Sequence, residues 1–408
     1  MSVKELPQLP QILQWYSDHG VLQKNVPRVL EKEYGVTMML QTVQKYSKDF
    51  NIVTVRQNGL MLEEQALAIN IITEEDPIGQ WGCCTVQEKL ALQGIHIHQD
   101  GIMAYQAAQD KDATDGCNPY IKKAHPHGLW SLGPNEEWCI DGHEKILKSM
   151  GIAVWGIADK CAHMELGLWA MPNARVQELP PALYLQLIKK QGDMALSTMM
   201  DKGTEVGKLI SLVKSMRALY ADVPEDILPS FKAVKSTFNI TRERSWHPLW
   251  EKELSNVTHE YQLGKIASGF HQGDPTHVAI SSWLWGQIIQ KHLDKIVEEN
   301  QNHKIRKQKK ILLPSSTRHI DIYNFPEDHE LIDCLIKVPE KDIDQLLLKF
   351  DQPDLLQFGT DEEVALCEKT YAAIGSPILL AKFGWEIFCN MVNYCIDNND
   401  WEAEEEGV

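Results

Sequence analysis

The region between residues 136 and 310 constrains the fold most, because short segments with strand character alternate there with longer helical ones. The strand-like segments are 137–140, 151–158, 164–171 and 195–200. Helical patterns occur at 180–190, 204–220 and 275–301. Three successive strands, followed by strands that are reached through helices, predict a mixed sheet with helices on its faces, which is an α/β fold.

Helical segments flank this region on both sides. Residues 1–55 predict three short helices, and residues 60–112 repeat the plan of helix, short turn and helix. That plan is typical of helix-turn-helix units, which bind DNA or pack against other proteins. We therefore predict two tandem units of this kind, an α/β domain over 130–310, and a connector with further helices and an acidic tail over 311–408.

The composition excludes several classes of protein. A net charge of −17 argues against a surface that attracts nucleic acid everywhere, but it allows a local basic groove. The most basic run, 303–310, is a solvated helix end, a nucleic-acid contact or a nuclear-import signal. No stretch approaches roughly 18 consecutive apolar residues, so we expect no membrane span. The nine cysteines include no Cys-x-x-Cys pair, which favours reduced thiols in the nucleus or cytosol over a zinc site.

Three acidic residues stand out in the central region. Asp141 follows an apolar run, Asp201 closes another, and Glu243 precedes a helical pattern that begins near Trp246. Carboxylates gathered at one point repel one another, and burying them is costly unless a cation lies among them. A pair of divalent cations solves this problem in sites that transfer phosphoryl groups. Spacing alone leaves another interpretation open, in which all three are solvated surface acids.

The segments around these acids carry a resemblance to a known family. They read Trp138-Cys-Ile-Asp141-Gly142, Gly156-Ile-Ala-Asp159, Asp201-Lys-Gly-Thr-Glu205, Asn239-Ile-Thr-Arg-Glu243-Arg-Ser-Trp246 and Asn302-His-Lys-Ile-Arg306. In order and spacing these motifs resemble the integrase core domain of fungal, transposon-derived proteins within the retroviral-integrase superfamily. The two N-terminal helical units also look like the tandem helix-turn-helix region of such proteins.

The resemblance implies an RNase H-like fold with a mixed five-stranded sheet, and metal-dependent DNA strand transfer or cleavage of the integrase or DDE transposase type. Asp141, Asp201 and Glu243 would be the catalytic triad and would hold two Mg²⁺ or Mn²⁺ ions. The implied partners are DNA, as element ends and target, and further copies of the chain in a homo-oligomer. The implied location is the nucleus, and a protein partner for the acidic C-terminal region stays open.

Basic residues are the candidates for contact with nucleic acid. They are Lys45, Lys48, Lys202, Arg242, Arg244, Lys304, Arg306 and Lys307. For those beside the triad, ion pairing at the surface is the alternative to phosphate contact. His143 and Glu144 also lie next to Asp141 in the sequence, and we expect His143 to be a supporting or surface residue.

The chain departs from the family pattern near two of the acids. Lys202 stands where the family has Arg, Arg242 replaces an apolar residue before the third acid, and Pro248 follows soon after. Because proline bends a helix or delays its start, Arg242 and Pro248 predict a displaced Glu243. Two other functions therefore stay open, namely a non-catalytic domesticated scaffold and a nuclease that cleaves RNA–DNA hybrids.

Overall fold

The computed structural model describes most of the chain. The described residues are 8–55, 59–109, 130–203, 206–234, 239–308, 312–350, 352 and 354–398. The chain forms two compact units, residues 1–125 and residues 126–408. The predicted acidic tail, nearly all of the linker before residue 130, and the pair Thr204 and Glu205 lie outside the described residues.

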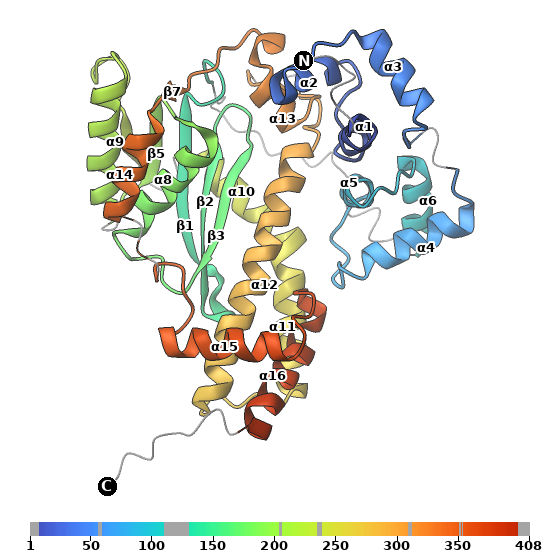
Figure 1. The fold of residues 1–408 in the computed structure, drawn as a ribbon, viewed down its shortest axis with the longest axis vertical. Coiled ribbons are helices and arrows are strands. Elements are labelled where there is room, and N and C mark those ends of the chain that lie inside the picture. The colour runs from blue at the N-terminus through green and yellow to red at the C-terminus, as the bar shows by residue number, and fades with distance from the viewer. Residues whose placement is uncertain are drawn as a thin grey trace. The chain divides into compact units, whose positions relative to one another are not determined.

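The first unit consists of short helices in two sets (Figure 1). Their bounds are α1 Leu9–Asp18, α2 Val26–Tyr34, α3 Leu40–Asp49, α4 Leu62–Thr73, α5 Cys83–Leu92 and α6 Gln99–Gln109. Gly35 ends α2 in the left-handed conformation (φ 63°), which glycine adopts without strain. Buried His96 pairs with Asp18 at the end of α1 (Nε2–Oδ1 2.8 Å), and this contact ties the two sets together.

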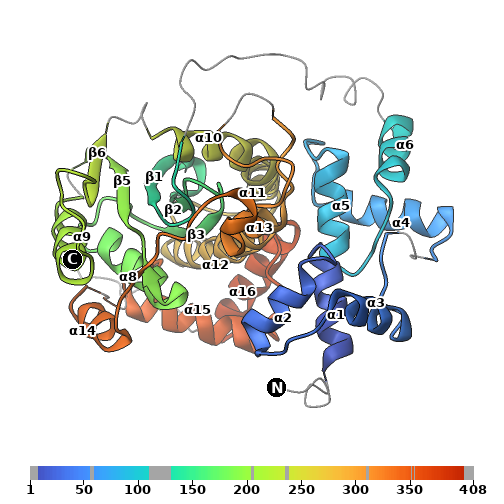
Figure 2. The ribbon, with the colours of Figure 1, turned by 90° about the horizontal axis from the view of Figure 1, so that it is seen from above.

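The second unit is built on a five-stranded sheet. Its strands are β1 Glu137–Leu147, β2 Ile152–Asp159, β3 Glu165–Met171, β5 Ser197–Asp201 and β6 Phe231–Val234. They lie in the order β3-β2-β1-β5-β6, which Figure 2 shows from above. The first three form an antiparallel meander, whereas β5 and β6 run parallel to β1. The predicted α/β class and mixed sheet are thus confirmed, and the strand order is consistent with an RNase H-like fold.

Helices cover both faces of this sheet (Figure 1). One face carries α8 Leu179–Gln191 and α9 Gly207–Tyr220, and the other carries α10 Ile240–Leu249, α11 Ser255–Ala267 and α12 Pro275–Asn302. Successive residues of a strand point to opposite faces, so each strand serves two cores. Trp138 and Ile140 of β1 enter the core under α8. Glu137 and Asp141, which alternate with them, therefore face the side of α10.

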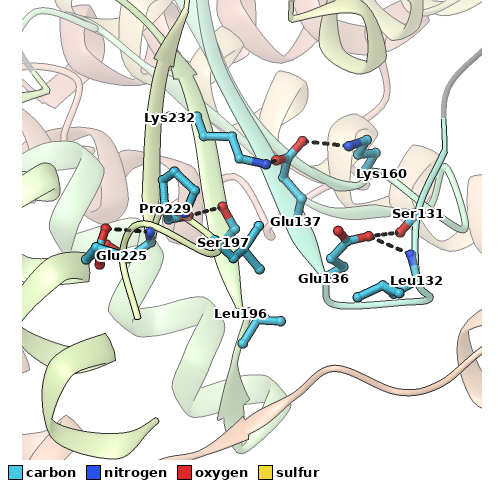
Figure 3. Close-up of polar contacts among 12 residues, drawn as sticks. Ser131, Leu132, Glu136, Glu137, Lys160, Leu196, Ser197, Glu225, Pro229 and Lys232 are labelled. Carbon is cyan, nitrogen blue, oxygen red and sulfur yellow. Dashed lines mark hydrogen bonds and ion pairs between the residues drawn. The ribbon is translucent and has the colours of Figure 1, made fainter. Parts of the chain in front are cut away.

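At its N-terminal end β1 carries a buried acid whose charge is matched. Glu137 is 1% exposed, and Lys232 from β6 and Lys160 after β2 both point to its carboxylate (Figure 3). The Nζ of Lys160 lies 3.1 Å from Oε1. Burial is the largest single influence on the pKa of Lys160 and lowers it, but the charge of Glu137, the hydrogen bond to Glu137 and weaker effects of nearby groups together raise it. Two cations of the same chain therefore stabilise this acid.

The outer edge of the sheet is closed by side chains of α12. Gln290 accepts a hydrogen bond from the N–H of Ala170 (2.8 Å) and donates one to the carbonyl oxygen of Leu168 (3.1 Å). Asn300 accepts from the N–H of Glu165 (2.7 Å). These amides make the hydrogen bonds that a neighbouring strand would make. The backbone groups of β3 at these positions are therefore not available to pair with another chain.

The C-terminal helices pack onto the same unit (Figure 1). They are α13 His319–Asn324, α14 Glu340–Phe350, α15 Asp361–Ala373 and α16 Gly384–Asn398, and a small second sheet pairs β4 Asp193–Met194 with β7 Ile336–Lys337. Ile343 of α14 joins the core under α8, whereas Cys367 and Phe388 join the core around α12. Of the described helices, none is both long and apolar enough to cross a membrane.

Most of the predicted elements are present at the expected places. Strands β1, β2, β3 and β5 and helices α8, α9 and α12 match the sequence-based segments to within a few residues at most ends. The largest difference is in β1, which runs on to Leu147 because its pairing with β2 continues past Ile140. No predicted segment corresponded to β6.

Candidate active site

Two of the three predicted acids lie where neighbouring parallel strands stop pairing. β1 and β5 pair side by side up to Ile140 and Met200, so Asp141 and Asp201 follow at the same level. In α/β sheets, ligands bind outside the carboxyl ends of parallel strands, where side chains face an open edge. β1 itself continues beyond this point because β2 supports it, with Gly156 as the partner of Asp141.

The third acid comes from α10. Buried Asn239, just before the helix, donates from Nδ2 to the carbonyl oxygen of Ile140 (2.9 Å). This bond fastens the start of the helix to β1 beside Asp141. Glu243 stands in the first turn, where its N–H bonds to the carbonyl oxygen of Asn239 (3.0 Å). One short connection thus determines where Glu243 lies relative to the sheet.

Pro248 neither ends the helix nor delays its start. The helix was predicted to begin near Trp246, but α10 begins at Ile240 and includes Glu243, so that prediction is wrong. The helix passes through Pro248 and widens directly afterwards into a π-turn at Trp250–Leu254. A proline lacks a backbone N–H, and wider turns of this kind relieve the resulting mismatch within a helix.

The three acids line one open cleft of about 480 Å³. Its walls comprise Asp141, Gly142, His143, Glu144, Lys145, Trp155, Ala174, Arg175, Asp201, Gly203, Glu243 and Trp246. Asp141 and Asp201 are half-buried, whereas Glu243 is exposed. The structure therefore brings all three predicted residues to one place, on two strands and one helix.

The pKa of each of these acids is raised. Burial raises the pKa of Asp141, although the hydrogen bond from Trp246 and the charge of Arg242 oppose it. Burial, and after it the charge of Asp141, raises the pKa of Asp201 to about 6. The same two causes raise the pKa of Glu243. Carboxylates that repel one another in this way gain from a cation among them.

The residues present fit a divalent cation of the hard type, such as Mg²⁺ or Mn²⁺, which prefers carboxylate oxygens. Oδ1 of Asp201 is buried without a hydrogen-bond partner among the described residues, so it is an oxygen ready to be a ligand. Within the same residues, however, no three His, Cys, Asp or Glu side chains already form a metal-binding group. Glu243 lines the same cleft, and its exposed side chain has several rotatable bonds.

Arg242 is buried and ion-paired, which contradicts the sequence-based prediction that it contacts nucleic acid. Its side chain is fully buried, and Nη1 lies 2.5 Å from Oε2 of Glu165 on β3. The guanidinium also stacks on the ring of Trp246, 4.2 Å from its centroid. The charge is accommodated because Glu165 matches it and because Gly156 leaves room, since a Cβ there would lie 2.2 Å from Nη2.

The other basic residues predicted to contact nucleic acid are exposed. They are Lys45, Lys48, Lys202, Arg244, Lys304, Arg306 and Lys307. None of the seven is among the described residues that line the cleft. Arg244 instead lies near His163, whose pKa is lowered to about 4 by burial and then by the Arg244 charge. For all seven, contact with nucleic acid stays a prediction.

Two cations in the cleft were missed by sequence reasoning. Arg175, in the turn after β3, forms a two-fold ion pair with Glu144 (2.6 and 2.8 Å). Lys145 lies on β1 and lines the same cleft. Because Lys145 follows Asp141 on the same strand, its presence in the cleft could have been predicted, whereas nothing in the sequence links Arg175 to this site.

Comparison with known proteins adds no name to this arrangement. No protein-family model matches the chain, and no curated protein matches it either. What the molecule itself establishes is an α/β unit whose sheet is consistent with an RNase H-like fold, with three acids that line one cleft beside the point where β1 and β5 stop pairing.

Proposed function

We propose that the protein carries out metal-dependent phosphoryl transfer on DNA, cutting or joining strands as integrases and DDE transposases do. One observation carries the proposal: Asp141, Asp201 and Glu243 line a single cleft where the parallel pairing of β1 with β5 stops. Bound Mg²⁺ or Mn²⁺ would supply an activated attacking oxygen and a stabilised leaving oxygen. The strand order of the sheet supports the proposal, because it is consistent with the RNase H-like fold of such enzymes.

Each acid has a distinct place in this proposal. Asp141, on the central strand, acts on both of the other carboxylates and is the natural shared ligand. Asp201 approaches from β5 with its unpartnered Oδ1, and Glu243 approaches from α10. The raised pKa of Asp201, about 6, leaves it mainly ionised at neutral pH and therefore able to bind a cation.

A cleft lined by acids repels a phosphate backbone, so DNA needs cations at the rim. Lys145 and Arg175 are exposed and line the cleft. Lys202, exposed directly after Asp201, offers a third charge. Lysine presents a single point charge rather than the planar fork of arginine, so Lys202 holds a phosphate without fixing its orientation.

The test is DNA nicking and strand joining by the purified full chain with Mg²⁺ or Mn²⁺, on supercoiled plasmid and on duplexes with free 3′-hydroxyl ends. We expect Asp141→Asn and Asp201→Asn to reduce product to background. Glu251→Gln removes an exposed acid just beyond α10 and should retain activity. The proposal fails if the wild type produces no more product than the two aspartate variants on every substrate, including an RNA–DNA hybrid.

A non-catalytic scaffold that keeps the fold is the second candidate. The net charge of −17 favours it, as does the absence, within the described residues, of a ready-made metal-binding group. Calorimetric titration with Mn²⁺ separates the two candidates. Binding that disappears in Asp141→Asn contradicts a purely scaffolding role, and a wild type that binds no Mn²⁺ supports it.

A further inference from the structure

The carboxylate of Asp141 is held in one orientation by two hydrogen bonds. Trp246 donates from its indole Nε1 to Oδ2 (2.7 Å), and the N–H of Gly142 donates to Oδ1 (2.9 Å). Trp246 belongs to α10, so this bond joins the first acid to the helix that carries the third. The indole ring itself is 4% exposed and therefore has little freedom to move.

Arg242 holds the indole in place from behind. Its guanidinium lies over the Trp246 ring, 4.2 Å from the centroid, and its far end is ion-paired to Glu165 on β3. The result is a continuous chain of contacts, Glu165 to Arg242 to Trp246 to Asp141, that crosses from the edge strand to the central strand. Its first three members are each less than a tenth exposed.

The sheet is shaped to admit this chain. Gly156 is the residue opposite Asp141 in the pairing of β1 with β2, and a Cβ at this position would lie 2.2 Å from Nη2 of Arg242. Nε and Nη2 of Arg242 have no hydrogen-bond partner among the described residues. A buried guanidinium that is only partly satisfied is a poor device for stability alone, because desolvation offsets much of the ion-pair attraction.

We propose that Arg242 and Trp246 are positioning residues for Asp141, and that they set its affinity for a divalent cation. The inference rests on the proposed metal-binding function of the three acids. A carboxylate held by one donor on each oxygen keeps its remaining lone pairs directed into the cleft. Loss of such supporting contacts typically weakens metal binding by roughly 10- to 100-fold.

The decisive variant is Trp246→Phe, which removes the indole N–H and keeps an aromatic ring for Arg242 to stack on. We expect Mn²⁺ affinity, measured by titration calorimetry on the folded full chain, to fall by roughly 10- to 100-fold. Trp250→Phe is the matched control, because it makes the same change at an exposed position after α10 and should leave the affinity unchanged. Asp141→Asn gives the reference for a lost ligand.

A second variant and a second measurement guard against simple misfolding. Arg242→Lys keeps the buried charge but loses the planar face that stacks on the indole, so we expect roughly 10-fold weaker Mn²⁺ binding. The indole N–H resonance of Trp246, assigned by its loss in Trp246→Phe, should shift when Mg²⁺ is added to the wild type and move in Arg242→Lys without metal. A role in packing alone would lower stability and leave the metal affinity of the folded fraction unchanged.

The outcomes separate this inference from the function on which it rests. A wild type that binds no Mn²⁺ overturns both. Binding that needs Asp141 but is the same in Trp246→Phe and in the wild type overturns only the positioning role. Binding that is weakened in Trp246→Phe and Arg242→Lys, but not in Trp250→Phe, supports it.

Discussion

Strand β1 carries two acids on the same face, and the structure surrounds them in opposite ways. Glu137 is fully buried between Lys160 and Lys232, so its charge is matched by its own chain. Asp141 shares its cleft with the carboxylates of Glu144, Asp201 and Glu243, and the guanidinium of Arg242 beside it is paired to Glu165. Of the described residues that line the cleft, only Lys145 and Arg175 carry a positive charge, and Arg175 is paired to Glu144. The charge of Glu137 is therefore matched, whereas acids outnumber cations around Asp141.

The difference indicates what each acid is for. A buried acid that serves the fold is neutralised by neighbouring side chains, because an unmatched charge in the interior is costly. An acid cluster in which carboxylates outnumber cations is destabilising until something binds there, which is typical of functional sites. Four measurements test whether the two acids differ in this way.

The largest expected effect comes from Arg242→Met, which leaves Glu165 buried without a partner. We expect the second unit to lose about 4 kcal/mol of unfolding free energy, as when one side of a buried ion pair is removed. Hydrogen exchange in peptides from β1 and β3 would measure this loss for that unit alone. The double variant Arg242→Met with Glu165→Leu should recover most of the lost unfolding free energy. If the double variant loses as much as Arg242→Met alone, the loss comes from packing and not from the unpaired charge.

At the other end of β1, Glu137→Gln should destabilise the same unit by about 3 kcal/mol. The effect is expected to be smaller than for Arg242 because Lys160 and Lys232 are partly exposed and can turn toward water. The change is measured by unfolding the full chain in urea and by following hydrogen exchange in peptides from β1. Glu178→Gln, in a more exposed pair with Lys208, should leave stability nearly unchanged and is the control.

Acid should weaken the second unit through half-buried His163 and buried His319. Burial lowers the pKa of His163 to about 4 and that of His319 to about 3, and Nδ1 of His319 lies 2.6 Å from the carbonyl oxygen of His163. The unfolded chain binds these protons near pH 6.5 and the folded chain does not, so stability falls as the pH drops below 6.5. We expect about 2 kcal/mol per histidine at pH 5. His163→Asn and His319→Asn should flatten the stability curve, and an unchanged slope would contradict the prediction.

The smallest effect has the opposite sign. Asp201→Asn should stabilise the metal-free protein by about 1 kcal/mol at pH 7.5, because it removes one of three repelling charges. The raised folded pKa, about 6, means that the wild type recovers this stability as the pH falls from 6 toward 3.8, where Asp201 is protonated. The gain from Asn should therefore vanish near pH 4. A loss of stability at pH 7.5 would show that Asp201 is structural, as Glu137 is.

The parts of the fold that were predictable are those with local signals. Strands β2 and β3 are long apolar runs, and Asp274 caps α12 as side chains of this type do. Strand β6, by contrast, is only four residues long, includes Lys232, and exists because β5 pairs with it. A strand of that length has no periodicity to detect.

The candidate site also has parts that were predictable from the sequence and parts that were not. Spacing alone did not group Asp141, Asp201 and Glu243. The resemblance of the motifs around them to a known family predicted that they belong together, and they line one cleft. The burial of Arg242 was not predictable, since a charged residue in a polar run indicates a surface. Its environment is made by Glu165 and Gly156, which are far away in the sequence and close only after the sheet has formed.

The pocket of Arg242 also restricts how a chain like this can arise by mutation. An arginine at 242 without an acid at 165 leaves a buried charge unpaired, and an acid at 165 without the arginine does the same. A side chain at 156 would clash with the guanidinium of Arg242, whereas a glycine at 156 clashes with no residue at 242. Starting from an apolar residue at 242, the glycine at 156 must therefore be in place before the arginine, and each of the two charges requires the other. Variants that carry only one of the two charges should be the least stable combinations.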